Sequence, residues 1–91
     1  MLHIVAYDIK DQKRMHKVAQ LCLDYGVRIQ YSIFQFDLNE YLTEQFVAEL
    51  KNIIDQDSDK VMIVPVCKKC RDSIQYIGQM KPFELPVLYL F

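Results

Sequence analysis

The sequence predicts an α+β domain in which two helices cover one face of a β-sheet. Short apolar segments of strand type alternate with longer segments whose apolar residues recur at helical spacing. The strand-type segments are residues 2–8, 27–38 and 61–67, and the helical segments are residues 11–26 and 39–54. Two helices can cover only one face of such a sheet, yet its strands are apolar on both faces. The second face is therefore expected to be left open for association.

The first strand covers residues 2–8 and ends in a carboxylate. Its sequence, Leu-His-Ile-Val-Ala-Tyr-Asp, is apolar up to Tyr7 and closes on Asp8. An acid at the end of a strand faces a surface rather than the core. Asp8 is thus placed either to hold a hard cation such as Mg²⁺ or to cap the following loop or helix.

A basic helix follows the first strand. Asp11 is a suitable N-cap and Gly26 a suitable C-terminal stop. The inward positions at helical spacing are Met15, Val18, Ala19, Cys22 and Tyr25. The first two turns carry Lys10, Lys13, Arg14 and Lys17. The helix dipole disfavours cations at this end. These side chains are therefore expected to bind a nearby phosphate.

Residues 27–38 alternate between apolar and polar side chains, but the phase changes once. Apolar residues occupy odd positions up to Ile33 and even positions from Phe34 onward. A shift of one residue predicts a bulge, a bend or a tight reversal near Ser32–Ile33. Since no Gly or Asn is present for a primed hairpin turn, turn chemistry favours one bent strand.

The second half of the chain predicts a helix followed by strands. Asn39 or Thr43 can cap the helix, whose inward residues are Leu42, Phe46, Leu50, Ile53 and Ile54. A solvated loop at 55–59 leads into the strand at 61–67, and a short strand is expected at 74–78. A connector bracketed by Pro82 and Pro86 leads to a final strand at 87–91.

Composition restricts the class of protein. The 91 residues, 52% of them hydrophobic, leave room for one domain, 1–91. The longest apolar runs are far shorter than the roughly 20 residues that span a bilayer, so no membrane association is expected. Three cysteines, an odd number, and the lack of a signal-type segment indicate a reducing, cytoplasmic setting.

The net charge of −1 is unevenly distributed. Residues 1–31 carry +2, residues 32–59 carry −6 and residues 60–91 carry +3. Two basic ends around an acidic middle predict one positive surface, as in a nucleic-acid-binding protein. The same pattern also suits ordinary charged faces that keep a small domain soluble.

Arg28, Ser32 and Phe34 share one face if the strand at 27–38 is straight. A guanidinium, a hydroxyl and an aromatic ring on one face suit contact with a phosphate and a base or sugar. The structural alternative is an Arg at the rim, a buried Ser and a Phe in the core.

Other chemical motifs are weak. Cys67-x-x-Cys70 resembles half of a zinc site or a redox pair, but no second ligand pair accompanies it, so no zinc site is assigned and Cys67 is expected in the core. The three aspartates at 55, 57 and 59 imitate the start of a calcium loop without its glycine or its final glutamate. His3 and His16 lack a visible acid–base partner and are interpreted as structural.

Three segments together resemble a known family. Val-Ala-Tyr-Asp-Ile at 5–9, the basic helix ending in Asp-Tyr-Gly at 24–26, and Arg-Ile-Gln-Tyr-Ser-Ile-Phe at 28–34 are similar to the small CRISPR-associated spacer-acquisition endonucleases, the Cas two family. The resemblance covers nearly the whole chain. It implies a ferredoxin-like βαββαβ fold, with residues 27–38 divided into two strands, against the turn chemistry.

The resemblance also implies an assembly and a site. The expected assembly is a homodimer packed through its sheets, with residues 82–91 extending the partner's sheet. Asp8 matches the family's metal-binding acid, shared between subunits around Mg²⁺ or Mn²⁺, with Arg28 as electrostatic support in catalysis. The residues expected to contact nucleic acid are Tyr7, Lys13, Arg14, Lys17, Arg28, Ser32 and Phe34.

Three functions follow from the resemblance. The first is a metal-dependent endonuclease on RNA or DNA that also bridges dimers of the CRISPR integrase, Cas one, during spacer acquisition. The second is a scaffold that binds the spacer-precursor duplex without catalysis. The third is a toxin-type ribonuclease of the same fold.

Overall fold

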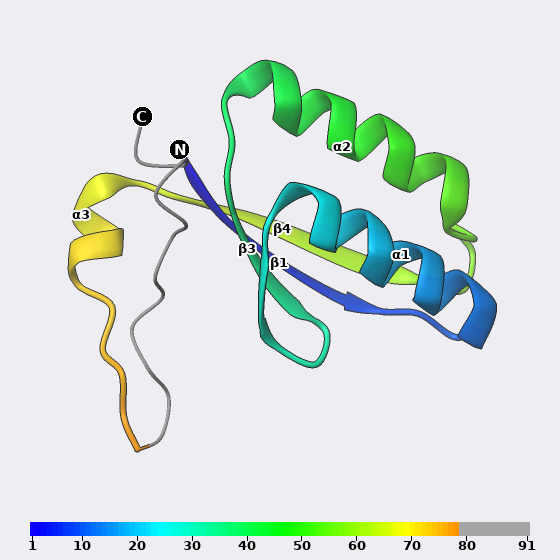
Figure 1. The fold of residues 1–91 in the computed structure, drawn as a ribbon, viewed down its shortest axis with the longest axis horizontal. Coiled ribbons are helices and arrows are strands. Elements are labelled where there is room, and N and C mark those ends of the chain that lie inside the picture. The colour runs from blue at the N-terminus through cyan, green and yellow to red at the C-terminus, as the bar shows by residue number, and fades with distance from the viewer. Residues whose placement is uncertain (79–91) are drawn as a thin grey trace.

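The computed structural model describes residues 1–78 of the chain (Figure 1). The elements are β1 (Leu2–Asp8), α1 (Gln12–Tyr25), β2 (Val27–Gln30), β3 (Ile33–Asp37), α2 (Glu40–Ile53), β4 (Lys60–Val66) and α3 (Lys68–Asp72). Within this part of the chain, no helix is long and apolar enough to cross a membrane.

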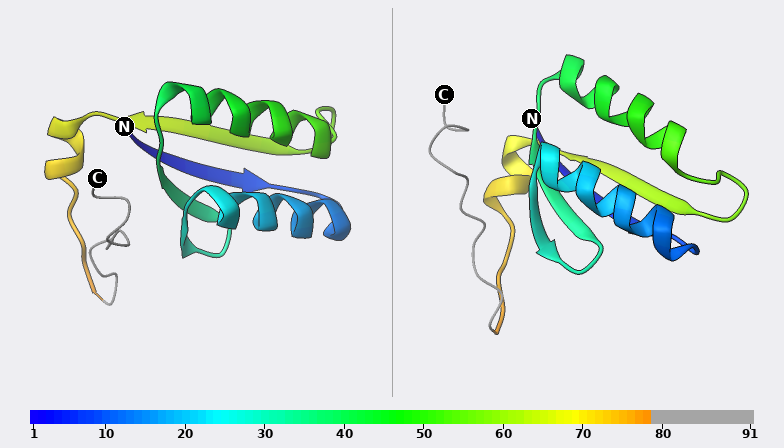
Figure 2. Two further views of the ribbon diagram at one scale, coloured as in Figure 1. Left: turned by 45° about the horizontal axis from the view of Figure 1, so that its top comes forward. Right: turned by 45° about the vertical axis from the view of Figure 1, so that its right-hand side comes forward.

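The four strands form one antiparallel sheet in the order β2-β3-β1-β4. Helices α1 and α2 lie side by side over the same face of this sheet (Figures 1 and 2). The core lies between these two layers and includes Val5, Val18, Phe34, Phe36 and Phe46, all 0–1% exposed. The α+β class and the ferredoxin-like βαββαβ order are therefore confirmed.

The preference for one bent strand over residues 27–38 was wrong, because β2 and β3 form a tight hairpin around Tyr31 and Ser32. None of the described non-glycine residues has a positive φ, so this is not the primed turn whose absence argued against a hairpin. The register shifts between Arg28 and Gln30, which leaves Ile29 as an extra residue in β2. The change of phase lies further on, inside β3: Ile33 pairs with Ala6 on the uncovered face, whereas Phe34 pairs with Val5 and lies in the core.

Helix α1 begins and ends where its sequence predicts. The side chain of Asp11 accepts a hydrogen bond from the backbone N–H of Arg14, at 2.9 Å. At the other end Gly26 is extended, so it does not act as a left-handed cap. A Cβ at this position would overlap the carbonyl oxygen of Gln35 and the ring of Phe36. Gly26 is needed because the chain passes so close to β3.

The second helix has one of its two predicted caps. The side chain of Asn39 accepts from the N–H of Leu42 at 2.8 Å, while the Thr43 hydroxyl donates to the Asn39 carbonyl. Phe46 and Leu50 are buried, as expected from the helical spacing. α2 thus supplies the second half of the layer that covers the sheet.

The region after β4 differs from the expectation. A short helix, α3, occupies Lys68–Asp72, and residues 74–78 form no strand. Arg71 of α3 pairs with Asp37 of β3, at 3.6 Å. The predicted connector and final strand, including residues 82–91, lie outside the described residues.

Candidate nucleic-acid and metal site

Asp8 ends β1 on the face of the sheet that α1 and α2 leave uncovered. Its side chain is 62% exposed, and its carboxylate lies 3.4 Å from the ammonium group of Lys10. Across the sheet it is paired with Lys60 of β4. The Asp8 carboxylate is therefore open to solvent, and the cationic group beside it is the ammonium of Lys10.

The donor set around Asp8 suits half of a Mg²⁺ site. Carboxylate oxygen is the ligand that Mg²⁺ prefers, and this ion commonly keeps several waters and takes only one or two protein carboxylates. Among residues 1–78, no three His, Cys, Asp or Glu side chains gather closely enough to hold a metal ion. Within residues 1–78 a metal at Asp8 would therefore be held by this one carboxylate, with water or a group from outside the chain in its other positions.

Apolar side chains surround Asp8 on the uncovered face. Ile4 pairs with Val64 and Ala6 pairs with Met62 across β1 and β4. Met62 is 60% exposed and Val64 38%. These four residues form a continuous row, called the open-face patch below, and Asp8 lies two positions beyond Ala6. Any partner that covers the patch would come close to the carboxylate.

Tyr7, Arg28 and Phe34 form a stacked group on the opposite, helix-covered face. The Tyr7 and Phe34 rings are stacked with centroids 6.0 Å apart, and the Arg28 guanidinium carbon lies 5.1 Å from the centre of the Phe34 ring. Burial raises the pKa of the Tyr7 hydroxyl, and the nearby Arg28 guanidinium opposes this rise. The group presents one exposed cation above two rings.

The expectation that Phe34 contacts nucleic acid was wrong. Its side chain is 0% exposed and belongs to the hydrophobic core. Because Phe34 pairs directly with Arg28 across the hairpin, it supports that side chain from below instead.

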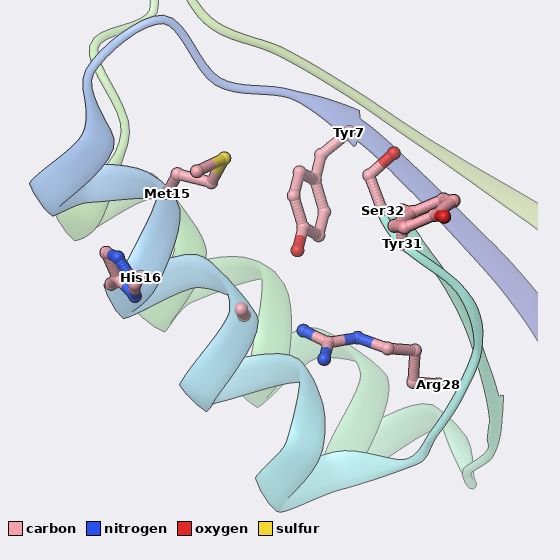
Figure 3. Close-up of a pocket in the computed structure, with 7 residues that line it drawn as sticks. Tyr7, Met15, His16, Arg28, Tyr31 and Ser32 are labelled. Atoms are coloured by element: carbon pink, nitrogen blue, oxygen red, sulfur yellow. The ribbon is translucent and has the colours of Figure 1, made fainter.

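A hollow of about 510 Å³ opens between α1 and the β2–β3 hairpin (Figure 3). Tyr7, Arg28 and Ser32 line it, and the Tyr7 hydroxyl and the Arg28 guanidinium point toward one another. Its other lining residues, which were not among the expected site residues, are Met15, His16, Ala19 and Tyr31. Two signals were available: the i, i+4 spacing of Met15 and Ala19, and Tyr31, an aromatic residue in the hairpin turn that is 85% exposed.

The structure does not bring Arg28 and Asp8 together within one chain. Arg28 lines the hollow beside α1, whereas Asp8 lines a separate, shallow depression with Lys60 and Met62 on the uncovered face. Successive residues of a strand face opposite sides, which places Tyr7 and Asp8 apart in the same way. Direct electrostatic support of Asp8 by Arg28 of the same subunit is therefore a wrong expectation.

The basic helix divides into exposed and paired cations. Lys13 and Lys17 are exposed on α1 and remain candidates for phosphate contact. Arg14 instead binds Asp59, with its Nε at 2.8 Å and its Nη2 at 3.3 Å from the two carboxylate oxygens. The role of Arg14 as a free phosphate ligand is thus contradicted.

Asp59 lies in an environment that differs from the one expected. The loop at 55–59 was expected to be solvated, yet the Asp59 side chain is fully buried. It also accepts hydrogen bonds from the backbone N–H groups of Lys10 and Asp55, each at 2.9 Å. The Arg14 guanidinium and these donors hold the pKa of Asp59 well below its usual range.

Cys67 and Cys70 are both exposed, so the expectation of Cys67 in the core was wrong. Cys67 precedes α3 as its N-cap, and its sulfur accepts from the backbone N–H of Cys70 at 3.5 Å. Their end of β4 is far from Asp8, because Val66 pairs with Leu2 whereas Lys60 pairs with Asp8.

Comparisons with known proteins agree on one family. The model of the family described as CRISPR associated protein Cas2 matches residues 1–74. The CRISPR-associated endoribonuclease Cas2 1 of Chloroflexus aurantiacus is 34% identical over 85 residues, covering 92% of this chain and 91% of that protein. The CRISPR-associated endonuclease Cas2 of Halalkalibacterium halodurans is 28% identical, with 93% of this chain and 94% of that protein covered.

Solved structures show the same fold. A hypothetical protein from Thermus thermophilus superimposes with a TM-score of 0.77 at 35% identity, covering 85% of this chain and 89% of that one. The Cas2 structure from Streptococcus pyogenes gives a TM-score of 0.76 at 29% identity, covering 86% and 100%.

Proposed function

Because this chain belongs to the CRISPR-associated Cas2 family, we propose that it is a Mg²⁺-dependent endonuclease that cuts RNA or DNA as a homodimer. The observation that carries the proposal is the exposed carboxylate of Asp8 at the end of β1, beside the open-face patch. The relatives' names, endoribonuclease and endonuclease, agree with chemistry on a phosphodiester.

The uncovered face supports the proposed homodimer. Ile4, Ala6, Met62 and Val64 would lose contact with water if two sheets packed face to face, and each buried large apolar side chain contributes about 1.5–3 kcal/mol. A two-fold axis through such an interface is the commonest assembly of identical chains. It would place Asp8 near Asp8 of the partner subunit.

Two facing carboxylates suit a shared Mg²⁺ ion, or Mn²⁺ in its place. When bound, such an ion supplies positive charge to a phosphodiester oxygen and lowers the pKa of water. Without a cation, the two carboxylates repel each other, so the dimer is expected to be more stable with Mg²⁺ than without it.

The other side chains of the site act on the nucleic acid itself. Arg28 is a forked donor over Phe34, suited to two oxygens of one phosphate. Tyr7 and Ser32 add hydroxyl groups to the same hollow. Lys13 and Lys17 on α1 extend the positive surface away from Asp8 and add affinity without reading sequence.

A second candidate function is a non-catalytic scaffold that holds spacer-precursor duplex between dimers of the CRISPR integrase, Cas one. The separation of Arg28 and Asp8 onto opposite faces of the sheet favours it, since binding and metal chemistry do not converge in one chain. A toxin-type ribonuclease would share the fold, and the neighbouring genes distinguish it from both.

The test compares wild type, Asp8→Asn and the control Asp57→Asn on single-stranded RNA and duplex DNA, with and without Mg²⁺ or Mn²⁺. Asp57 is an exposed loop acid that keeps net charge matched between variants. We expect cleavage only with metal, lost in Asp8→Asn and kept in the control. Light scattering should show all three proteins as dimers. Equal cleavage by Asp8→Asn would remove Asp8 from the reaction, and no cleavage by any of them would favour the scaffold.

A further inference from the structure

The exposed cysteine pair at the start of α3 belongs to no part of the proposed nuclease site. Helix α3 lies at one end of the sheet (Figure 1). Cys67 and Cys70 are at this end, opposite to Asp8, because Val66 pairs with Leu2 whereas Lys60 pairs with Asp8. Both thiols are exposed, and the two residues are in contact through the hydrogen bond from Cys70 N–H to the Cys67 sulfur. The third cysteine, Cys22, is buried in the core. The chain thus carries one pair of accessible thiols. The buried thiol of Cys22 serves as a control that should not react while the protein is folded.

The geometry points to a thiol–disulfide exchange site: we propose that Cys67 and Cys70 react with a glutathione-type disulfide to form a reversible bond within the chain. Side chains three residues apart at a helix turn have Cβ atoms about 5–6 Å apart, and a disulfide needs roughly 3.5–4.5 Å. A shift of about 1–2 Å therefore closes the bond. Some strain remains in it, which favours easy reduction.

The two thiols differ in a way that assigns their roles. The hydrogen bonds that Cys70 donates to Cys67 lower the pKa of Cys67, whereas the hydrogen bond to Cys67 and its charge raise the pKa of Cys70. Cys67 is thus the attacking thiolate and Cys70 the resolving thiol. Lys68, Lys69 and Arg71 flank the pair and complement an anionic disulfide such as oxidised glutathione.

The exchange proceeds in two balanced steps. The Cys67 thiolate attacks one sulfur of oxidised glutathione, forming a mixed disulfide and releasing one glutathione thiolate. Cys70 then loses its proton to water, and its sulfur attacks Cys67, which releases the second glutathione. The two cysteines give up two electrons, and one disulfide of the oxidant is reduced to two thiols.

The test exposes the full chain to defined ratios of oxidised to reduced glutathione, traps free thiols by alkylation and measures mass. We expect wild type to lose about 2 Da and two alkylation sites, with Cys22 still reduced, and to regain both with excess glutathione. Burial raises the pKa of Cys22 to about 12, which keeps it unreactive while the fold is intact.

Single variants separate the two roles. Cys70→Ser should accumulate a glutathione adduct on Cys67 faster than Cys67→Ser does on Cys70. The reason is that Cys70→Ser keeps the backbone N–H that lowers the pKa of Cys67, which raises the thiolate fraction of Cys67. Circular dichroism checks that each variant is folded.

Three results would overturn the proposal. One is wild-type protein that keeps both thiols, or carries two glutathione adducts, at every ratio. Another is oxidation of Cys22 at the same rate, which means that the fold has opened. The third is stoichiometric Zn²⁺ held by the pair and blocking oxidation, which makes it a metal site. Because the readout is thiol chemistry, failure here leaves the proposed nuclease untouched.

Discussion

The guanidinium of Arg14 forms an ion pair with the buried carboxylate of Asp59, and Nε of Arg14 lies 2.8 Å from one carboxylate oxygen. This pair joins the first turn of α1 to the residue that precedes β4, 45 positions further along the chain. The same carboxylate accepts from the backbone of Lys10, in the loop that follows Asp8. Asp59 therefore fixes the segment from which both Asp8 and the basic helix emerge.

The first prediction concerns the pH dependence of stability. Since the pKa of Asp59 is lowered in the folded protein, its ionised form stabilises the fold above the unfolded value of about 3.9. That stabilisation is lost as pH falls below about 4 toward the folded-state pKa. Urea unfolding between pH 7 and pH 2 should show the decline in wild type and a flatter curve in Asp59→Asn.

Asp57→Asn is the matched control for this experiment. It removes one loop carboxylate that is exposed. Asp59→Asn should lower the midpoint of unfolding at pH 7, and the control should leave it nearly unchanged, as is usual for a surface substitution. Equal midpoints for both variants would contradict the structural role of Asp59.

The second prediction concerns Arg28. Arg28→Ala should weaken binding of labelled single-stranded RNA about tenfold or more, because a charge-assisted hydrogen bond contributes roughly 1.5–3 kcal/mol. Stability should fall by only about 0.5–1 kcal/mol, from loss of the contact with Phe34. Fluorescence anisotropy and thermal unfolding measure the two effects. Arg28→Lys should restore part of the affinity, and unchanged binding by Arg28→Ala would leave Arg28 a purely structural role.

The third prediction concerns the exposed lysines of α1. Lys13→Gln with Lys17→Gln should reduce the slope of log affinity against log salt by about 0.7–0.9 for each lost phosphate contact. Binding isotherms at several salt concentrations provide the slope. Lys51→Gln, an exposed lysine in the last turn of α2, is the control. If the slope does not change, the nucleic acid binds elsewhere.

The fourth prediction concerns the open-face patch. Met62→Lys should raise the dimer dissociation constant about 100-fold or more, since a two-fold interface loses the side chain twice at roughly 1.5 kcal/mol each. Because Met62 is exposed in the single chain, folding should be retained. Analytical ultracentrifugation measures the constant. Met15→Lys, which changes an exposed methionine of α1, should leave it unaltered.

Local chemistry in the sequence was sufficient for most of the fold. Asp11 and Asn39 cap their helices through side-chain oxygens, as the sequence predicts. Apolar spacing gave both helices and the strands β1 and β4. The segments at 5–9, 24–26 and 28–34 resemble the family to which the chain belongs. The hairpin at Tyr31–Ser32 could not be derived from turn residues, because it is not a primed turn and none of its residues has a positive φ.

The position of Asp8 at the end of β1 follows from the strand boundary in the sequence alone. The hollow lined by Tyr7, Arg28 and Ser32 is visible only in the tertiary structure. Only the tertiary structure determines which basic side chains of α1 are available to a ligand and which are paired within the chain. Arg14 and Lys13 look equivalent in the sequence, yet only Arg14 reaches a buried acid 45 residues away. Tertiary structure likewise put Arg28 and Asp8 on opposite faces and Phe34 in the core. The reason is that pairing across a sheet and burial depend on segments distant in sequence, which no local pattern encodes.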